Sequence, residues 1–560
     1  MKYSILFLLF FVFSFLFRTD YSFDQDLGRH LKIGEIITKT HQIPKANLFS
    51  YTNPDFPFIN THWLFEAFVY VWSITLGLQS LLVLKIVIFL FSTWLIFMII
   101  PKENRSLLLP IGFIFLHVLR ERLELRPEIF SFLFTAISVY ILNKYIQQKT
   151  KLIYLLPLIQ LIWINTHIYF FVGLILEFIF LIDLFIRRRG VNVIHPSGGL
   201  AWHLVLILLL SLGVSLINPN GIRGLLYPLN VNANYGYSIV ENQTMFLLQN
   251  IGFRDPNFLF VKLAVTICAI ALFVAAARRV FDLRNILLVV FGAGLALLNV
   301  RSFPYLIFLS LPSVMISLGS IKRSWFTNFL SVVTFVLLIT ESFLYLNGDY
   351  YKYIENPNTP TLSYVESGEK ALDFVLANNL PQPIFNNFDI GSYIIYRGFP
   401  KYRVFVDGRP EAYPAEFFLN TYIPDQYDYN KFKILESQVN FKTIIFSHTD
   451  QTPWGVSFLK SVVADSTWKI VYIDDFMIIL TKPEVTNQKQ IPILDLAQLN
   501  PDSYQFSSYL SYLKLGLFLL RTQNTESAGR FIEKTLKLFP KDPIANSLIG
   551  NQLPTNWFFW

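Results

Sequence analysis

The chain has 560 residues, of which 53% are hydrophobic, with a formal net charge of +8 and a mean hydropathy of +0.46. This excludes an ordinary soluble domain, in which about 45–50% of residues are apolar and long uncharged runs are rare. Residues 79–100, 258–277 and 325–346 each reach the roughly 20 residues that a membrane-spanning helix needs. Because the basic residues fall mostly in short loops between apolar runs, they are expected to set topology, and we expect no nucleic-acid partner.

The first apolar run, residues 3–17, is interpreted as an uncleaved first span. A secretory signal peptide would end in small residues at a cleavage site. Here the run is followed by Arg18, Thr19 and Asp20. The N-terminus is therefore expected inside.

Short basic loops between apolar runs predict the topology, because such loops remain in the cytoplasm. For all of them to lie on one side, each neighbouring pair must be separated by an even number of crossings. This requires that residues 61–77 form an interfacial helix and not a span. That segment carries His62, Glu66 and several aromatic residues, a composition that suits a helix at the membrane surface. The basic loops contain Lys102 with Arg105; Lys144, Lys149 and Lys151; Arg187–Arg189; Arg278, Arg279 and Arg284; and Lys322 with Arg323.

About eleven spans result, and the outward segments between them hold most of the unusual polar residues. Polar groups at membrane depth are costly and usually functional. We therefore expect the functional site on the outer side of a cytoplasmic membrane. The predicted transmembrane domain is 1–346, with an external loop at 18–78; its spans are 3–17, 79–100, 106–118, 129–146, 152–164, 168–186, 200–217, 258–277, 285–299, 302–320 and 325–346.

After the last span the composition becomes that of an extracytoplasmic α/β domain, residues 347–486. Short β-rich runs alternate there with helical stretches. The predicted strands are 383–388, 402–409, 443–448, 468–473 and 476–482, and the predicted helices are 370–378, 415–422 and 431–439.

Residues 487–560 are predicted to form a polar linker, 487–500, and a helical tail. The tail's spacing resembles a single tetratricopeptide repeat. One such repeat cannot bury its own apolar face and would need a partner surface, which predicts a protein partner at the tail. A plain amphipathic helical hairpin fits the pattern as well. The residues that carry the spacing are Leu515, Gly516, Ala528, Phe531, Leu536 and Pro540.

Two carboxylates, Asp24 and Asp26, stand just past the first span in SFDQDLGRHLKIGEIITKTHQIP. His30 follows Asp26 by four residues, on the same face if the segment is helical. A carboxylate here can act as a general base on an acceptor hydroxyl or bind a divalent cation such as Mg or Mn. The alternative for Asp26 is a helix N-cap.

Arginines stand at the outward starts of two spans, Arg126 in VLRERLELRPEIF and Arg301 in NVRSFPYLIF, and His167 lies in an outward turn. Arginine is the preferred bidentate partner of phosphate, so these residues predict an anion site. Solvated ion pairs with neighbouring glutamates, or interfacial anchoring, are the alternatives. Arg409, after Asp407-Gly408, could reach an acidic group at the membrane face, although Asp-Gly is also a common turn pair.

On these motifs the chain resembles the GT-C superfamily of polyprenyl-phosphate-dependent glycosyltransferases, nearest the protein-mannosyltransferase and aminoarabinose-transferase branch. FDQDLGRHLKIGEIITKTHQIP stands where that branch has its acidic pair and following helix. NTHWLFEAFVYVWSITLGLQSLLVLK stands at its surface helix and second span, and LRPEIFSFLF at a later arginine-bearing span start. Residues 20–410 are also similar to a group of uncharacterised bacterial membrane proteins related to that superfamily. NNFDIGSYI resembles the WWDxG motif of oligosaccharyltransferase catalytic subunits, without either tryptophan.

The resemblance implies inverting transfer of a sugar from a polyprenyl phosphate or diphosphate to an acceptor hydroxyl on a protein, a lipid or a cell-envelope glycan. Asp26 would be the base, assisted by Asp24. The residues expected at the lipid phosphate or sugar are His30, His62, Glu66, Arg126, His167, Arg301 and Arg409.

Two alternatives remain open beside the enzyme. A non-catalytic relative or lipid-linked-glycan translocator would keep the arginines but use the carboxylates structurally, and an assembly scaffold would be organised by the tail. An Asp26 that faces an empty cavity would favour the enzyme. An Asp26 held in salt bridges would favour the alternatives.

Overall fold

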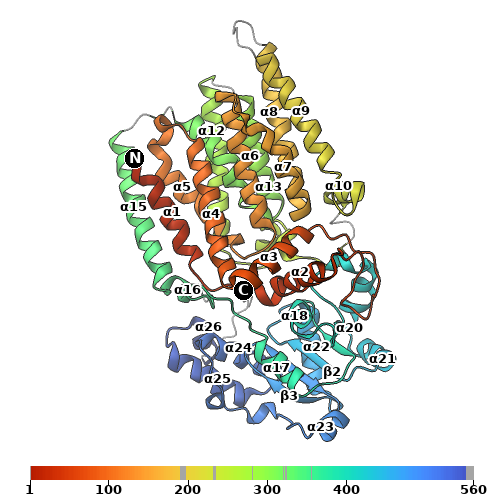
Figure 1. The fold of residues 1–560 in the computed structure, drawn as a ribbon. Helices are drawn as coiled ribbons and strands as arrows, with labels where there is room; N and C mark the ends of the chain where they lie inside the picture. The colour runs from red at the N-terminus through yellow and green to blue at the C-terminus, as the bar shows by residue number, and fades with distance from the viewer. Residues whose placement is uncertain are drawn as a thin grey trace.

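The computed structural model describes residues 2–189, 197–230, 235–279, 282–319, 321, 324–354 and 356–549. A helical bundle forms one end of the molecule, and a domain built around a small sheet forms the other (Figure 1). Of Asp24 only the backbone is described.

The bundle contains a helix at every predicted span. Among the described residues five helices, α4, α6, α8, α12 and α15, are long and apolar enough to cross a membrane, and the others are shorter. The count of eleven crossings stays a prediction. The bundle helices are α1 (Lys2–Leu16), α4 (Ser80–Ile99), α5 (Leu108–His117), α6 (Glu128–Gln148), α7 (Leu156–Thr166), α8 (Phe171–Arg189), α9 (Ser197–Val214), α12 (Asn257–Ala277), α13 (Leu283–Leu298), α14 (Leu311–Leu318) and α15 (Trp325–Leu346).

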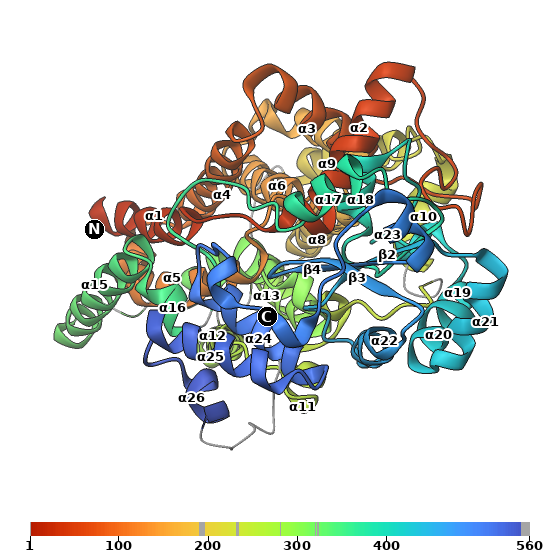
Figure 2. The ribbon, with the colours of Figure 1, turned by 90° about the horizontal axis from the view of Figure 1, so that it is seen from below.

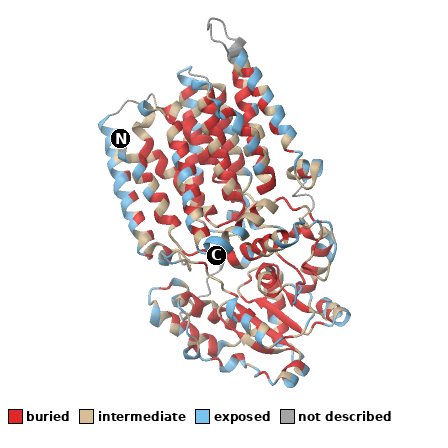
Figure 3. Ribbon diagram, viewed as in Figure 1, coloured by how far each residue is buried: buried red, intermediate tan, exposed pale blue. Residues whose placement is uncertain are grey.

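Helix α15 shows how the bundle meets its surroundings. Only 22% of the residues in its 18-residue apolar stretch are buried within the protein. Phe329, Val332 and Phe343 are exposed. Figure 3 shows this helix largely exposed at the edge of a bundle whose interior is buried. Apolar side chains turned outward at this density are suited to lipid and would be unfavourable in water.

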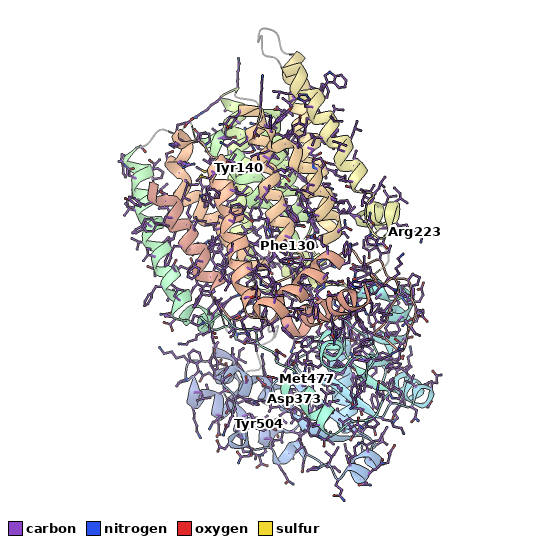
Figure 4. The ribbon with its side chains drawn as sticks, viewed as in Figure 1. Phe130, Tyr140, Arg223, Asp373, Met477 and Tyr504 are labelled. Atoms are coloured by element: carbon purple, nitrogen blue, oxygen red, sulfur yellow. The ribbon has the colours of Figure 1, made fainter. Side chains whose placement is uncertain are left out.

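The direction of α6 agrees with the predicted position of one basic loop. Phe130 lies nearer the C-terminal domain and Tyr140 farther from it (Figure 4). The basic end of α6, with Lys144 and Lys149, therefore lies at the end of the bundle away from that domain. Which compartment each end faces stays a prediction.

Helices α2 (Gly28–Thr40) and α3 (Trp63–Leu76) lie together across the end of the bundle that faces the C-terminal domain (Figures 1 and 2). Their close approach requires a glycine, because a Cβ on Gly34 would lie 2.1 Å from the carbonyl oxygen of Glu66. Helix α3 has the place expected of the interfacial helix 61–77.

The C-terminal domain is built on a four-stranded mixed sheet in the order β1-β2-β4-β3. β1 pairs parallel with β2, and the other two pairings are antiparallel. Four of the five predicted strands are present: β1 (Ile384–Asn386), β2 (Thr443–Ser447), β3 (Lys469–Ile473) and β4 (Met477–Thr481).

The predicted strand 402–409 is wrong as a member of this sheet. Val404 forms an isolated bridge with Ser50 of the first external loop. Its N–H donates to the Phe49 carbonyl at 3.0 Å, and the Tyr51 N–H donates to its carbonyl at 3.3 Å. Val404 does pair as a strand residue would, but its partner comes from the membrane half of the chain. This pairing fastens the loop to the domain.

Helices cover the sheet and join it to the bundle. The three predicted helical stretches are confirmed, with 415–422 formed by α19 and a π-helical turn, whereas α18, α20, α22 and α23 were not predicted. Helix α18 lies against α2, since a Cβ on Gly28 would lie 3.0 Å from the Cβ of Tyr396. The helices are α17 (Glu369–Ala377), α18 (Gly391–Gly398), α19 (Ala415–Phe417), α20 (Ile423–Tyr427), α21 (Tyr429–Val439), α22 (Pro453–Ala464) and α23 (Pro483–Lys489).

The tail forms helices α24 (Tyr509–Arg521), α25 (Thr525–Leu538) and α26 (Pro543–Ile549). Its apolar face joins the core of the sheet domain; the ring of Phe518 lies 4.9 Å from that of His448. The partner surface that a single helix pair needs is thus supplied, at least in part, by this chain itself. The tetratricopeptide likeness and an outside protein partner stay predictions.

Candidate functional site

Three arginines from two span boundaries converge on one carboxylate. Glu241, in the 3₁₀ turn Val240–Asn242, lies 2.5 Å from Arg122 Nη1, 2.7 Å from Arg126 Nη1 and 3.0 Å from Arg301 Nη2. Burial raises the pKa of Glu241, but the three guanidinium charges more than offset this and hold it well below its usual range. Glu241 is therefore ionised.

Other glutamates complete this arginine cluster, which we define as Arg122, Arg126 and Arg301. Arg122 Nε lies 2.5 Å from Glu128, and Arg301 Nε lies 3.9 Å from the other oxygen of Glu128. Arg126 Nη2 lies 2.7 Å from Glu124. The ion-pair interpretation of this loop is confirmed, but Arg122 and Glu128 are buried and not solvated.

Asp26 lies beside the cluster, between two cations. Its Oδ1 is 2.8 Å from Arg29 Nη2 and its Oδ2 is 3.3 Å from Arg126 Nε. Burial raises the pKa of the Asp26 carboxyl, but Arg126 and Arg29 more than offset this and lower it to about 2. The helix-cap alternative is wrong: the N-cap of α2 is Leu27, with no side-chain hydrogen bond.

A row of imidazoles leads from Asp26 toward the bundle. The ring of His62 lies 5.9 Å from that of His30 and 5.6 Å from that of His167. His30 Nδ1 lies 3.0 Å from Glu66 Oε1, and His167 Nδ1 lies 2.7 Å from Ser131 Oγ. Burial lowers the pKa of all three histidines, so the row is neutral at pH 7 and offers both donors and acceptors.

Arg409 is placed differently from the other predicted residues. Both of its bonds to Asp407 are short, at 2.6 and 2.8 Å, and it donates to Asn47 Oδ1 at 3.0 Å. Its guanidinium lies over the rings of Phe49 and Phe58, and 1% of the residue is exposed. These contacts fasten the external loop to the C-terminal domain; contact with a substrate stays a prediction.

A second carboxylate, Asp389, lies near Asp26. Burial raises the pKa of Asp389 to about 7, and the charges of Asp450 and Asp26 contribute. The turn that follows 402–406 also reaches this place, since a Cβ on Gly408 would lie 4.0 Å from Asp26 Oδ1. Asp389 is the acidic residue of NNFDIGSYI.

The described residues do not form a site that fits a divalent cation. No group of three or more His, Cys, Asp or Glu among them could hold a metal ion. The oxygens of Asp26 face guanidinium groups, and the side chain of Asp24, the other predicted ligand, lies outside the described residues.

No family model matches the chain, and no curated protein matches it. A solved structure does. The archaeal oligosaccharyltransferase AglB from Archaeoglobus fulgidus, in complex with an inhibitory peptide and a dolichol-phosphate, aligns with a TM-score of 0.53 and 12% identity. The alignment covers 96% of this chain and 86% of that chain. The two chains share a fold.

The GT-C class and its mannosyltransferase branch both stay predictions. Sequence reasoning placed Asp26, Arg126, Arg301 and the histidine row in one region, and the structure brings them together. It missed Arg29, Arg122, Glu128 and Glu241. One signal for Glu241 was present: it is the only acidic residue between Asp183 and Asp255.

Proposed function

We propose that this protein transfers a sugar from a polyprenyl phosphate or diphosphate to an acceptor hydroxyl, with inversion, at the outer surface of the cytoplasmic membrane. The observation that best supports this is the arginine cluster where the bundle meets the C-terminal domain. Its guanidiniums already bind an anion, the carboxylate of Glu241. The fold shared with an oligosaccharyltransferase solved with a dolichol-phosphate supports the same class of donor.

The cluster would act on the leaving group. As the bond between the anomeric carbon and the phosphate oxygen breaks, the electron pair moves to the phosphate. Guanidiniums aimed at that oxygen stabilise the growing charge. A lipid phosphate is a good leaving group, so no paired carboxylic acid of the kind used in glycoside hydrolysis is needed.

Asp26 would receive the acceptor's proton. With a pKa of about 2 it is a weak base, whereas an efficient base has a pKa near the working pH. The attacking hydroxyl becomes strongly acidic once its oxygen bonds the anomeric carbon, so proton transfer late in the reaction suits such a base. Asp24 would assist, and the neutral histidine row with Glu66 would hydrogen-bond the sugar.

One observation favours a second function. Asp26 lies between Arg29 and Arg126 at 2.8 and 3.3 Å, which is the salt-bridged arrangement expected of a non-catalytic relative or lipid-linked-glycan translocator. In that protein the arginines still bind phosphate, and the carboxylates brace them. Release of polyprenyl phosphate from a lipid-linked sugar, dependent on Asp26, would distinguish the enzyme.

Binding of farnesyl phosphate to the purified protein tests the anion site. Arg301→Ala should weaken binding more than Arg301→Lys, because one charge-assisted contact is worth roughly 1.5–3 kcal/mol, or about 10- to 150-fold. Arg223→Ala is the matched control, since this exposed arginine lies beside the bundle but outside the cluster (Figure 4). If both Arg301 variants bound like wild type, Arg301 would be an interfacial anchor only.

A further inference from the structure

We infer that Glu241 is an internal occupant of the phosphate site, which the donor's phosphate must displace before transfer can begin. The inference rests on the proposed function and adds a gating residue to it. A carboxylate held by three guanidiniums is in the environment that arginine clusters provide for phosphate.

The segment that carries Glu241 is anchored on its N-terminal side, where the ring of Tyr237 stacks on that of Phe388 at 4.3 Å and a Cβ on Gly236 would lie 2.2 Å from the Ala415 carbonyl oxygen. The Val300 N–H donates to the Gln243 carbonyl at 3.1 Å, and Gln243 Nε2 donates to Ser238 Oγ within the same segment. Val240 is 47% exposed. Between these backbone contacts, the three arginines hold the side chain of Glu241.

A firm anchor follows directly along the chain. Met245 and Leu248 of helix α11 (Met245–Asn250) are buried. Both flanks of the turn are thus anchored, so Glu241 can leave the arginines by a movement confined to the residues between Tyr237 and Met245, without unpacking the core. The side chain of Glu241 is 25% exposed, so an anion can approach it from outside.

Removal of Glu241 would leave the arginines partly paired. Arg122 keeps Glu128, and Arg126 keeps Glu124. Three guanidiniums would then face two glutamates, which leaves one positive charge for the incoming phosphate. Asp26 and Arg29 neutralise each other.

The test compares farnesyl phosphate affinity among three proteins. The apparent affinity of wild type is reduced by the fraction of molecules in which Glu241 has left the arginines. If Glu241 occupies the site for about 90–99% of the time, this affinity should be lowered about 10- to 100-fold. Glu241→Gln should raise affinity by that factor. The matched control is Glu124→Gln, which removes the same charge but, in the described residues, an ion pair with one arginine only.

The inference would be overturned if both variants gained affinity for farnesyl phosphate to a similar extent. It would also be overturned if wild type bound and Glu241→Gln gained no affinity. Either outcome would leave the proposed function standing. No binding by any of the three proteins would overturn both. If Glu241→Gln bound more tightly than wild type by the expected factor but no sugar transfer were found, the gating role of Glu241 would be supported and the proposed enzymatic activity would be wrong.

A second measurement does not depend on the folding of the Glu241→Gln variant. Spin labels at Val240→Cys and Ile434→Cys, in a Cys268→Ala background, sit at exposed positions on the turn and on α21. Farnesyl phosphate should shift the distribution of distances between the two labels, as measured by double electron–electron resonance. An unchanged distribution at saturating ligand would show that the turn stays in place, and the inference would be wrong.

Discussion

Replacing Asp26 by asparagine removes a charge and keeps the size of the side chain. The pKa of Asp26 is lowered from 3.8 to about 2 in the folded protein, chiefly by Arg126 and Arg29 against the opposing effect of burial. At roughly 1.4 kcal/mol per pKa unit, this difference contributes about 2 kcal/mol of stability at neutral pH. The side chain is 20% exposed, so solvent screening is limited.

The pH dependence has a definite sign. Because the folded-state pKa is the lower one, the contribution is fully present above about pH 4 and is lost as the pH falls through about 2. Asp26→Asn should therefore be less stable than wild type at pH 7 by about 2 kcal/mol, and the two should converge near pH 2. Tryptophan fluorescence during unfolding in detergent measures both.

Glu35→Gln is the matched control for this stability effect. Glu35 lies on α2, the helix that follows Asp26, and pairs with Lys32 and Lys39 at the surface, where a pair is worth about 0–1 kcal/mol. Turnover of Asp26→Asn should fall by roughly 10²- to 10⁴-fold, the usual effect of a positioned general base.

A double-mutant cycle with Arg29→Gln would isolate the pair at 2.8 Å. An Asp26→Asn protein as stable and as active as wild type would refute both the ion-pair argument and the base. If stability fell by the expected amount but turnover did not, Asp26 would be a brace, as in the translocator.

Three further outcomes are expected. Gly34→Ala should lower the melting temperature because its Cβ would lie 2.1 Å from the Glu66 carbonyl oxygen, whereas Gly294→Ala, with nothing within 4 Å, should not; equal melting temperatures would disprove the close packing of α2 on α3. A cysteine at position 102 should not react with an impermeant maleimide added outside cells. Labelling of this cysteine would show that the predicted topology is inverted. Chelation with EDTA should leave farnesyl phosphate binding unchanged, since guanidiniums provide the contacts, and loss of binding would indicate a cation at Asp24 and Asp26.

The sequence alone determined the features that depend on neighbouring residues. Lengths of apolar runs predicted the bundle helices, because a helix surrounded by lipid must be apolar along its whole length. His62, Glu66 and the aromatic residues of 61–77, with a glycine at its end, predicted an interfacial helix, and its place at a membrane surface stays a prediction. Alternating apolar residues predicted four strands of the sheet, since side chains alternate along a strand.

Only the tertiary structure decided which distant residues meet. Arg126 and Glu241 are 115 positions apart, and Arg301 and Glu241 are 60 apart, so no periodicity links them. The segment 402–409 has the pattern of a strand, but its partner lies in the external loop, more than 350 residues earlier. Charge pairing and backbone pairing across such separations depend on how the bundle and the domain pack, and for that reason Asp26, Arg126 and Arg301 could be found from the sequence while Glu241, the carboxylate that joins the two arginines, could not.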